Sequence, residues 1–349
     1  MSDTQDLIIQ TASKLFEDHC TPETLRLAEQ GHWPDTLWEL MEQTGLSRVS
    51  LPEEVGGAGG DLSDALAVLR IAGQFAVPLP LAETYLAGWI LAASGRALPA
   101  GSHTVAFSQS GTEVCFHRRA SRWILSGTIR HVGWARHAQQ ILVLGHAEDR
   151  LSLALVRPEQ ITISPARNLA GEPRDTLTFT DVEVPEVIPA AITLDRAWNR
   201  AALTRAALMA GALEGILRQS VRYTGERVQF GRSLNHFQAV QQQLALLAGE
   251  VAASRIAVEA AALAAEQGEA TAAVAASKIR VGEAAGQAAA IAHQVHGAMG
   301  YTHEYPLHFL TKRLWAWRDE FGSESQWAER LGHQIAAQGA GALWPFLAA

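Results

Sequence analysis

The sequence contains little cysteine, since Cys20 and Cys115 are its only two cysteines among 349 residues. Small secreted domains that depend on disulfides carry dense cysteine frameworks, so this class is excluded. The sequence also lacks an apolar run long enough to cross a bilayer, because Glu, Lys, Arg and Gln interrupt its alanine-rich stretches. We therefore expect no membrane-spanning helix.

Concentrated positive charge is absent as well. There are 28 Lys and Arg residues against 36 Asp and Glu residues, which gives a formal net charge of −8. Without a basic block, nucleic acid is excluded as an expected partner. The acidic N-terminus shows no basic segment leading into an apolar one, so we expect no signal peptide and a cytoplasmic location. The hydrophobic share of 48% predicts a globular protein of two or three domains.

The distribution of residue types divides the chain into three zones. Residues 1–100 show apolar side chains at helical spacing, interrupted by the Gly-rich loop LPEEVGGAGG at 51–60, and predict an N-terminal helical domain. Residues 101–190 predict a small barrel or sandwich. They contain seven short β-prone runs separated by turns, at 104–107, 113–117, 123–129, 140–144, 151–156, 161–164 and 176–182. Residues 191–349 return to helical patterning. The sequence therefore predicts a multidomain α+β protein.

The third zone has the most regular pattern. Val240, Leu244, Leu247 and Val251 recur on one face of a long helix. Gly268 is predicted to end this helix, and a second long helix is expected to start near residue 271.

Five segments together resemble the acyl-CoA dehydrogenase family over nearly the whole length. They are LPEEVGGAG at 51–59, WILSGT at 123–128, FTDVEVP at 179–185, YTGERVQFG at 223–231 and QVHGAMGYTHE at 294–304. The last two are the most specific. The resemblance implies an N-terminal helical domain, a middle β-domain and a C-terminal four-helix bundle, with FAD as cofactor, an acyl-CoA as substrate and an electron-transfer flavoprotein as electron acceptor.

The resemblance also implies which residues hold FAD. In the family the two C-terminal motifs reach into the flavin site of a neighbouring subunit. Carried over residue by residue, Arg227 contacts the pyrophosphate and Gln229 hydrogen-bonds it, which suits a guanidinium and a dianion. The remaining residues of the expected cradle are Phe230, Leu234, Gln238, Gln294 and the backbone around Gly297 and Ala298.

The expected catalytic base is missing from both places where the family keeps it. Removing the weakly acidic α-proton of an acyl-CoA needs a carboxylate. Most members use a Glu late in the bundle, and counting from Tyr305 brings Phe321 to that position. Other members use a residue two positions before the tyrosine of the flavin motif, which is Val221 here. The nearest carboxylates are Asp319 and Glu320, and Glu320 is the candidate base.

The side of the middle domain that faces the flavin ring is altered too. Where members usually carry a longer polar loop, this sequence has only SQSGT at 108–112. The aromatic residue and the Thr expected after WILSGT align with His131 and Gly133, although Trp134 is adjacent and is the candidate ring contact. The sequence thus keeps the family's residues that contact the ADP moiety of a partner's FAD. It matches the family poorly at the residues that contact the chain's own flavin ring.

Three hypotheses follow for the function. In one, the chain is the short subunit of a heteromeric acyl-CoA dehydrogenase, and a longer partner supplies the base and the ring contacts. In another, it is a self-sufficient homo-oligomeric dehydrogenase that uses Glu320. In the third, it is a non-catalytic acyl-CoA-binding or partner-binding protein. Some short family members act on bulky ring-bearing thioesters such as steroid side chains.

We assign no functional role to two other residue pairs. His293 and His296 lie three residues apart, but no carboxylate or thiolate at ligand spacing accompanies them, so no metal site is predicted. Arg200 and Arg205 could assist with the phosphates of CoA, but we interpret them as solvated charges on a helix face.

Overall fold

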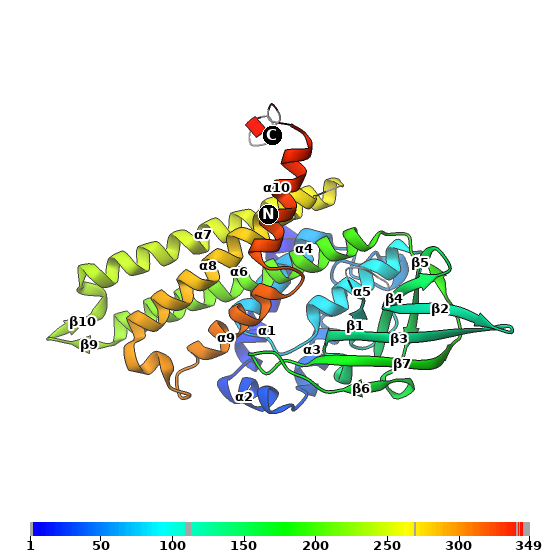
Figure 1. Ribbon diagram of the computed structural model, residues 1–349. Coiled ribbons are helices and arrows are strands. Elements are labelled where there is room, and N and C mark those ends of the chain that lie inside the picture. The colour runs from blue at the N-terminus through cyan, green and yellow to red at the C-terminus, as the bar shows by residue number, and fades with distance from the viewer. Residues whose placement is uncertain (1–2, 109–112, 269, 340, 342, 345–349) are drawn as a thin grey trace. The chain divides into compact units, whose positions relative to one another are not determined.

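The computed structural model describes residues 3–108, 113–268, 270–339, 341 and 343–344, and Figure 1 shows its elements. The chain separates into two compact units. The first contains residues 1–72 and 76–201, and the second contains residues 73–75 and 202–349. The division into domains at residues 100 and 190 stays a prediction. Among the described residues, no helix is long and apolar enough to cross a membrane.

Five α-helices open the chain. They are α1 (Asp3–His19), α2 (Pro22–Gln30), α3 (Asp35–Gln43), α4 (Leu62–Gln74) and α5 (Leu81–Ala93), with short 3-10 turns at η1 (Leu46–Arg48) and η2 (Glu53–Val55). Amphipathic spacing explains α3, whose Leu37, Trp38 and Met41 are buried. In contrast, α5 is apolar all round and buried along most of its length, as expected for a helix inside a core.

The spacing of apolar residues did not predict α2, although the sequence contains its end signals. Thr21 caps the helix, because its Oγ1 accepts a hydrogen bond from the Thr24 N–H at 3.2 Å. Pro22 takes the first helical position, and Gly31 closes the helix with a φ of 104°. Only Leu25 is buried, so the apolar pattern was too weak to reveal the helix.

The β-strands of the first unit form one eight-stranded sheet, and the seven strands predicted from the sequence all belong to it. The strand order is β6-β7-β3-β2-β4-β5-β8, and β1 pairs with β4. The strands are β1 (His103–Ala106), β2 (Val114–Arg119), β3 (Arg122–Gly133), β4 (Gln140–Ala147), β5 (Arg150–Val156), β6 (Thr162–Ser164), β7 (Arg174–Val184) and β8 (Ile188–Pro189).

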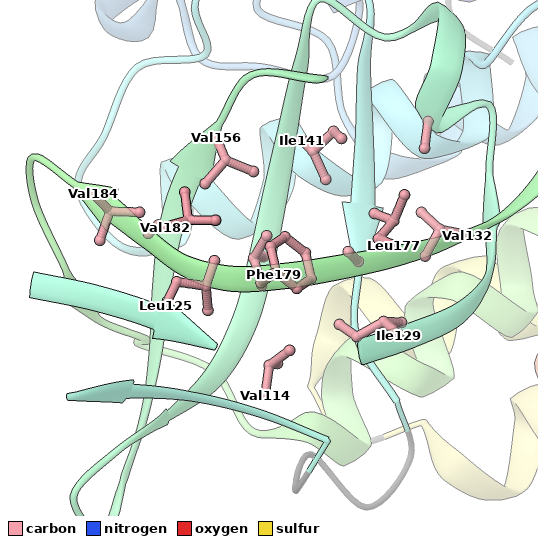
Figure 2. Close-up of a cluster of buried hydrophobic side chains, with 14 of the residues drawn as sticks. Val114, Leu125, Ile129, Val132, Ile141, Val156, Leu177, Phe179, Val182 and Val184 are labelled. Carbon is pink, nitrogen blue, oxygen red and sulfur yellow. The ribbon is translucent and has the colours of Figure 1, made fainter. Parts of the chain in front are cut away.

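The pairing between β3 and β7 is irregular at two places. The register shifts between Leu125 and Gly127 and again between Ile129 and Val132. Such bulges bend a strand and redirect its side chains. His131 lies within the second shift and has a φ of 60°. The branched and aromatic side chains of this sheet, among them Leu125, Ile129 and Phe179, point toward one another in a common core (Figure 2).

The second unit is helical apart from a short hairpin. From residue 202 it contains the rest of α6 (Leu194–Glu226), the strands β9 (Val228–Gln229) and β10 (Arg232–Ser233), and the turn η5 (Leu234–His236). Then follow α7 (Gln238–Gln267), α8 (Thr271–His296), η6 (Gly297–Tyr301), α9 (Leu307–Asp319) and α10 (Glu324–Ala337). Gly268 ends α7 with a φ of 144°, and α8 begins at residue 271, as the sequence predicted.

A buried lysine ties α8 to the end of α9. Lys278 is 1% exposed, and its Nζ donates hydrogen bonds to the carbonyl oxygens of Trp317 at 3.2 Å and Arg318 at 2.9 Å. These carbonyls belong to the last turn of α9, where unpaired acceptors and the helix dipole favour a cation. Burial nevertheless lowers the pKa of Lys278 to about 7, because removing the ammonium from water disfavours its charged form.

This lowered pKa predicts a stability that rises with pH. In the unfolded chain Lys278 keeps its proton up to about pH 10.5, whereas in the fold it loses the proton near pH 7. The unfolded state therefore binds more protons between these values, and the free energy of unfolding increases across that window. We expect a rise of ~2 kcal/mol from Lys278 between pH 7 and pH 9, measured by urea unfolding.

Lys278→Met should remove this rise, whereas Lys14→Met, which changes an exposed lysine of α1, should leave it intact. The same pH profile in wild type and in Lys278→Met would show that the buried ammonium does not titrate in this range.

Candidate functional site

The first half of the candidate cofactor site is the β9–β10 hairpin. Its two turn residues, Phe230 and Gly231, have φ values of 52° and 81°, the left-handed pair that a two-residue hairpin requires. The Arg227 N–H donates to the Tyr223 carbonyl at 2.8 Å, and the Leu234 N–H donates to the Arg227 carbonyl at 2.9 Å. These bonds hold the backbone of the hairpin and leave the side chain of Arg227 exposed.

The second half is the end of α8. Gly297 caps this helix with φ 57° and ψ −140°, a conformation essentially restricted to glycine, and its N–H donates to the Gln294 carbonyl. A Cβ at Gly297 would meet nothing within 4 Å, so the backbone conformation and not crowding demands glycine here. Gln294, Gly297 and Ala298 are all exposed.

Stacked aromatic rings bring these two halves together. The Tyr223 ring stacks on the His296 ring with centroids 4.5 Å apart, and Tyr305 contacts both rings. His296 is 3% exposed, and its Nδ1 lies 2.7 Å from the Ala292 carbonyl, so we assign the proton to Nδ1. Burial lowers the pKa of His296, which keeps the ring neutral against the tyrosine face. The last turns of α6 and α8 are thereby joined at one end of the bundle.

We call the eight predicted cofactor residues of this region the bundle-end site. They are Arg227, Gln229, Phe230, Leu234, Gln238, Gln294, Gly297 and Ala298. All are exposed except Leu234, which is half-buried, and Phe230 is 91% exposed. The polar members offer one guanidinium and three carboxamides, a donor set that fits a diphosphate and a nucleoside. An aromatic side chain so exposed is also typical of a surface that another molecule covers.

The ring-side candidate Trp134 has a different environment. It is 7% exposed and lies in an aromatic cluster of the first unit, with the Trp33 ring edge-on at 6.4 Å and His137 at 6.3 Å. This packing leaves little of the indole for a cofactor. His131 is exposed on its bulge. Most of the shortened loop, residues 109–112, lies outside the described residues. The contact between Trp134 and a flavin stays a prediction.

Residues 319–323, which we call the base loop, connect α9 to α10. Phe321 lies at the position where we expected a carboxylate from the sequence, and its φ is 56°. Its carbonyl accepts a hydrogen bond from the indole Nε1–H of the buried Trp327 at 3.0 Å. Ser323 caps α10, because its Oγ accepts from the Gln326 N–H while the Gln326 side chain accepts from the Ser323 N–H. The loop is therefore fixed at both ends.

The candidate base Glu320 is held in an ion pair. The Arg205 Nε donates to Glu320 Oε2 at 2.5 Å, and the two side chains are 4% and 17% exposed. The Arg205 guanidinium also lies 5.4 Å from the centre of the Phe321 ring. A general base must direct a free lone pair at the proton that it removes. Here one carboxylate oxygen is already committed to a buried cation.

The structure corrects our interpretation of the two α6 arginines as solvated charges. Arg205 is 3% exposed because it pairs with Glu320. Arg200 is half-buried, and its guanidinium lies 4.6 Å from the centre of the Trp89 ring. Helical periodicity shows which face a residue occupies but not which distant carboxylate or ring lies opposite. For the same reason the sequence did not reveal Lys278, a buried cation at the end of α9.

Two family models match the chain. The model described as "Acyl-CoA dehydrogenase, N-terminal domain" matches residues 2–97, and "Acyl-CoA dehydrogenase, C-terminal domain" matches residues 193–319. Among curated proteins, the acyl-CoA dehydrogenase IpdE2 of Mycolicibacterium smegmatis is 30% identical, over 96% of this chain and 100% of its own. The IpdE2 of Mycobacterium tuberculosis is 31% identical, over 88% of this chain and 90% of its own.

Solved structures show the same fold. The structure described as "Tcur3481-Tcur3483 steroid ACAD G363A variant" has a TM-score of 0.88 and 29% identity, and the match covers 97% of this chain and 99% of that one. Butyryl-CoA dehydrogenase from Megasphaera elsdenii has a TM-score of 0.86 at 18% identity, with 96% and 98% covered. The expected order of helical, sheet and helical parts is thereby confirmed.

The ion pair predicts a strong energetic coupling between α6 and the base loop. Arg205→Met leaves the Glu320 carboxylate without its buried cation and should lower the free energy of unfolding by about 3 kcal/mol. Glu320→Gln should lower the free energy of unfolding by a similar amount, because it leaves the buried Arg205 guanidinium without its carboxylate. The double variant Arg205→Met/Glu320→Gln should be more stable than the sum of the two losses by at least ~1 kcal/mol, as a double-mutant cycle in urea measures. Additive losses would contradict the pairing.

Proposed function

The chain belongs to the acyl-CoA dehydrogenase family, and on this premise we propose that it is the short subunit of a heteromeric dehydrogenase. The protein is an FAD-dependent oxidoreductase that acts on CH–CH bonds. In the proposed assembly this chain contributes the bundle-end site to an FAD held mainly by a longer partner of the same family. The partner contributes the base and the contacts to the flavin ring.

The base loop is the observation that carries this proposal. Phe321 has no acid–base chemistry, and the adjacent Glu320 is paired with the buried Arg205 at 2.5 Å. Val221, at the other position where the family keeps a base, is apolar and 51% exposed. The chain thus offers no unpaired carboxylate at either position. A self-sufficient enzyme that uses Glu320 would first have to break a buried ion pair, at a cost of about 3–5 kcal/mol.

The bundle-end site suits a supporting role toward the cofactor. When bound, FAD accepts the hydride from the β-carbon of the acyl-CoA. In our proposal the Arg227 guanidinium donates to the pyrophosphate oxygens, and the carboxamides of Gln229, Gln238 and Gln294 donate to the same half of the cofactor. The open backbone at Gly297 and Ala298 lets peptide N–H groups approach an anion closely. Phe230 and Leu234 flank the adenosine.

The substrate that we propose is a bulky, ring-bearing acyl-CoA thioester. The support is the 29% identical solved structure, which is described as a steroid enzyme and named by two components. We propose in addition that electrons leave the reduced enzyme through an electron-transfer flavoprotein, as is usual for the family.

Cofactor content tests the subunit role directly. The chain expressed alone should be colourless, and co-expression with a longer family member encoded nearby should give a complex that absorbs at about 450 nm, the flavin band. In that complex Arg227→Gln should lower the FAD content per complex at least ~tenfold, because a charge-assisted contact to the pyrophosphate is lost. Arg26→Gln, which changes an exposed arginine of α2, is the matched control. Stoichiometric FAD on the chain alone would refute the subunit role.

Turnover tests the source of the base. Glu320→Gln in the complex should leave kcat with an artificial electron acceptor within about twofold of wild type. Loss of a true general base costs about 100-fold or more. A loss of that size in Glu320→Gln, with the FAD content unchanged, would assign the base to this chain and favour the self-sufficient enzyme.

A further inference from the structure

The turn between β2 and β3 carries a basic segment that the proposed function does not use. The segment reads HRRASRW at residues 117–123. β2 ends at Arg119 and β3 begins at Arg122, so Ala120 and Ser121 form a two-residue turn. The φ of Ala120 is 56°, the left-handed conformation that favours such a tight turn. Ser121 therefore lies at the tip of a hairpin, where its side chain is exposed.

The end of this hairpin lies beyond the body of the sheet. β2 pairs with β4 at Cys115 and Phe116, and from His117 to Arg119 its pairing is with β3. Figure 1 shows β2 extending past the neighbouring strands at this end of the first unit. The backbone around Ser121 is therefore open to an approaching enzyme, and the hydroxyl can be reached while the sheet stays intact.

The residues before Ser121 match the pattern by which basophilic protein kinases choose a serine. These kinases bind arginines two and three residues before the acceptor with their own carboxylates, because paired guanidinium and carboxylate groups are strong and directional. Arg119 and Arg118 hold these two positions, and both are exposed. No other serine or threonine in the sequence follows two arginines at these positions. The pattern therefore singles out one hydroxyl of the chain.

The tip also contains groups that can hold a phosphate. Arg119 and Arg122 lie opposite each other across the turn, so their side chains share one face of the hairpin. They donate to Asp181 at 2.8 Å and to Glu183 at 2.7 Å, and all four side chains are at least 50% exposed. Exposed ion pairs contribute little stability. A phosphate dianion on Ser121 can therefore replace these carboxylates as the partner of both guanidinium groups.

The third arginine of the tip faces the other way. Arg118 precedes Arg119 in the strand, so its side chain projects from the opposite face. Its guanidinium lies 4.6 Å from the centre of the Trp123 ring, which is the residue paired with it on β3. Stacking on an aromatic face leaves the donors in the plane of a guanidinium open to a carboxylate. Arg118 is thus placed for recognition by an enzyme, whereas Arg119 and Arg122 are placed to hold the product.

We infer that Ser121 is a phosphorylation site for a basophilic protein kinase, and that Arg119 and Arg122 hold the phosphate. In the transfer Ser121 Oγ forms a bond to the γ-phosphorus of ATP, the bond from that phosphorus to the β–γ bridging oxygen breaks, and ADP leaves. The hydroxyl proton passes to the catalytic carboxylate of the kinase.

The modification reverses the charge of the hairpin tip. Three arginines stand against the two carboxylates of Asp181 and Glu183, which leaves one positive charge. A phosphate adds nearly two negative charges, so the formal charge of the tip changes to about −1. Such a reversal alters the rate at which a charged partner associates with this end of the sheet. The inference does not depend on the proposed subunit role.

Phosphorylation in vitro tests the site. The full chain, with any co-purified partner, is incubated with magnesium, ATP and cyclic-AMP-dependent protein kinase as the basophilic probe. Peptide mass spectrometry should find one phosphate per chain, on Ser121, and Ser121→Ala should remove it. Arg119→Gln should slow the incorporation at least ~tenfold, because a charge-assisted contact to the kinase is lost. Arg150→Gln, which changes an exposed arginine at the β4–β5 turn, should leave the rate unchanged. Modification of other residues alone, or of Ser121 only after unfolding in urea, would overturn the inference.

Phosphorus NMR of the modified chain tests whether the tip holds the phosphate. The second pKa of the Ser121 phosphate should lie below its ordinary value of about 6, because nearby guanidinium groups favour the dianion. Arg122→Gln keeps both arginines that the kinase binds and should raise this pKa back toward about 6, whereas Arg150→Gln should not. An ordinary pKa in the phosphorylated wild type, or the same lowered pKa in Arg122→Gln, would contradict the role that we assign to Arg122.

Discussion

The buried contact between the Arg205 guanidinium and the Glu320 carboxylate joins the middle of α6 to the last residue before Phe321. Both groups are largely buried, so either one alone would be an uncompensated buried charge. The fold is therefore stable only when it holds the two together. Lys278 extends this arrangement by holding the last carbonyls of α9 from the α8 side. These three hydrogen bonds, one donated from α6 and two from α8, thereby define the path of the chain into the base loop.

This electrostatic arrangement has a direct consequence for catalysis. A loop that must deliver a proton acceptor needs a carboxylate with a free lone pair and a raised pKa, which an apolar site provides. Here the loop carries a phenyl ring at the position where we expect a base, and the neighbouring Glu320 carboxylate faces a guanidinium. The ion pair that stabilises the end of the bundle thus also occupies the carboxylate that could have served as a general base. The proposed function follows from this arrangement.

The bundle-end site depends on a weaker kind of contact. Stacking of Tyr223 on His296 brings together two motifs that are some seventy residues apart in sequence, while the functional side chains themselves project outward. Anchoring residues are buried and contacting residues are exposed, which is the arrangement expected of a surface that completes a neighbour's site.

The sequence by itself determined most of the fold. Period-two and period-3.6 patterns predicted seven strands of the sheet and the long helices α7 and α8, because these elements bury one face along their whole length. It also identified the family, through motifs whose spacing rarely arises by chance, and it predicted that Phe321 takes the place of the usual base.

Only the tertiary structure decided what surrounds these residues. The pairing of Arg205 with Glu320, the burial of Lys278 and the packing of Trp134 against Trp33 each join segments far apart in the chain. Periodicity measures neighbours along one element, whereas the partner of a buried charge is set by how elements pack. For that reason α6 looked like a helix with solvated arginines until its contacts with the end of α9 were visible.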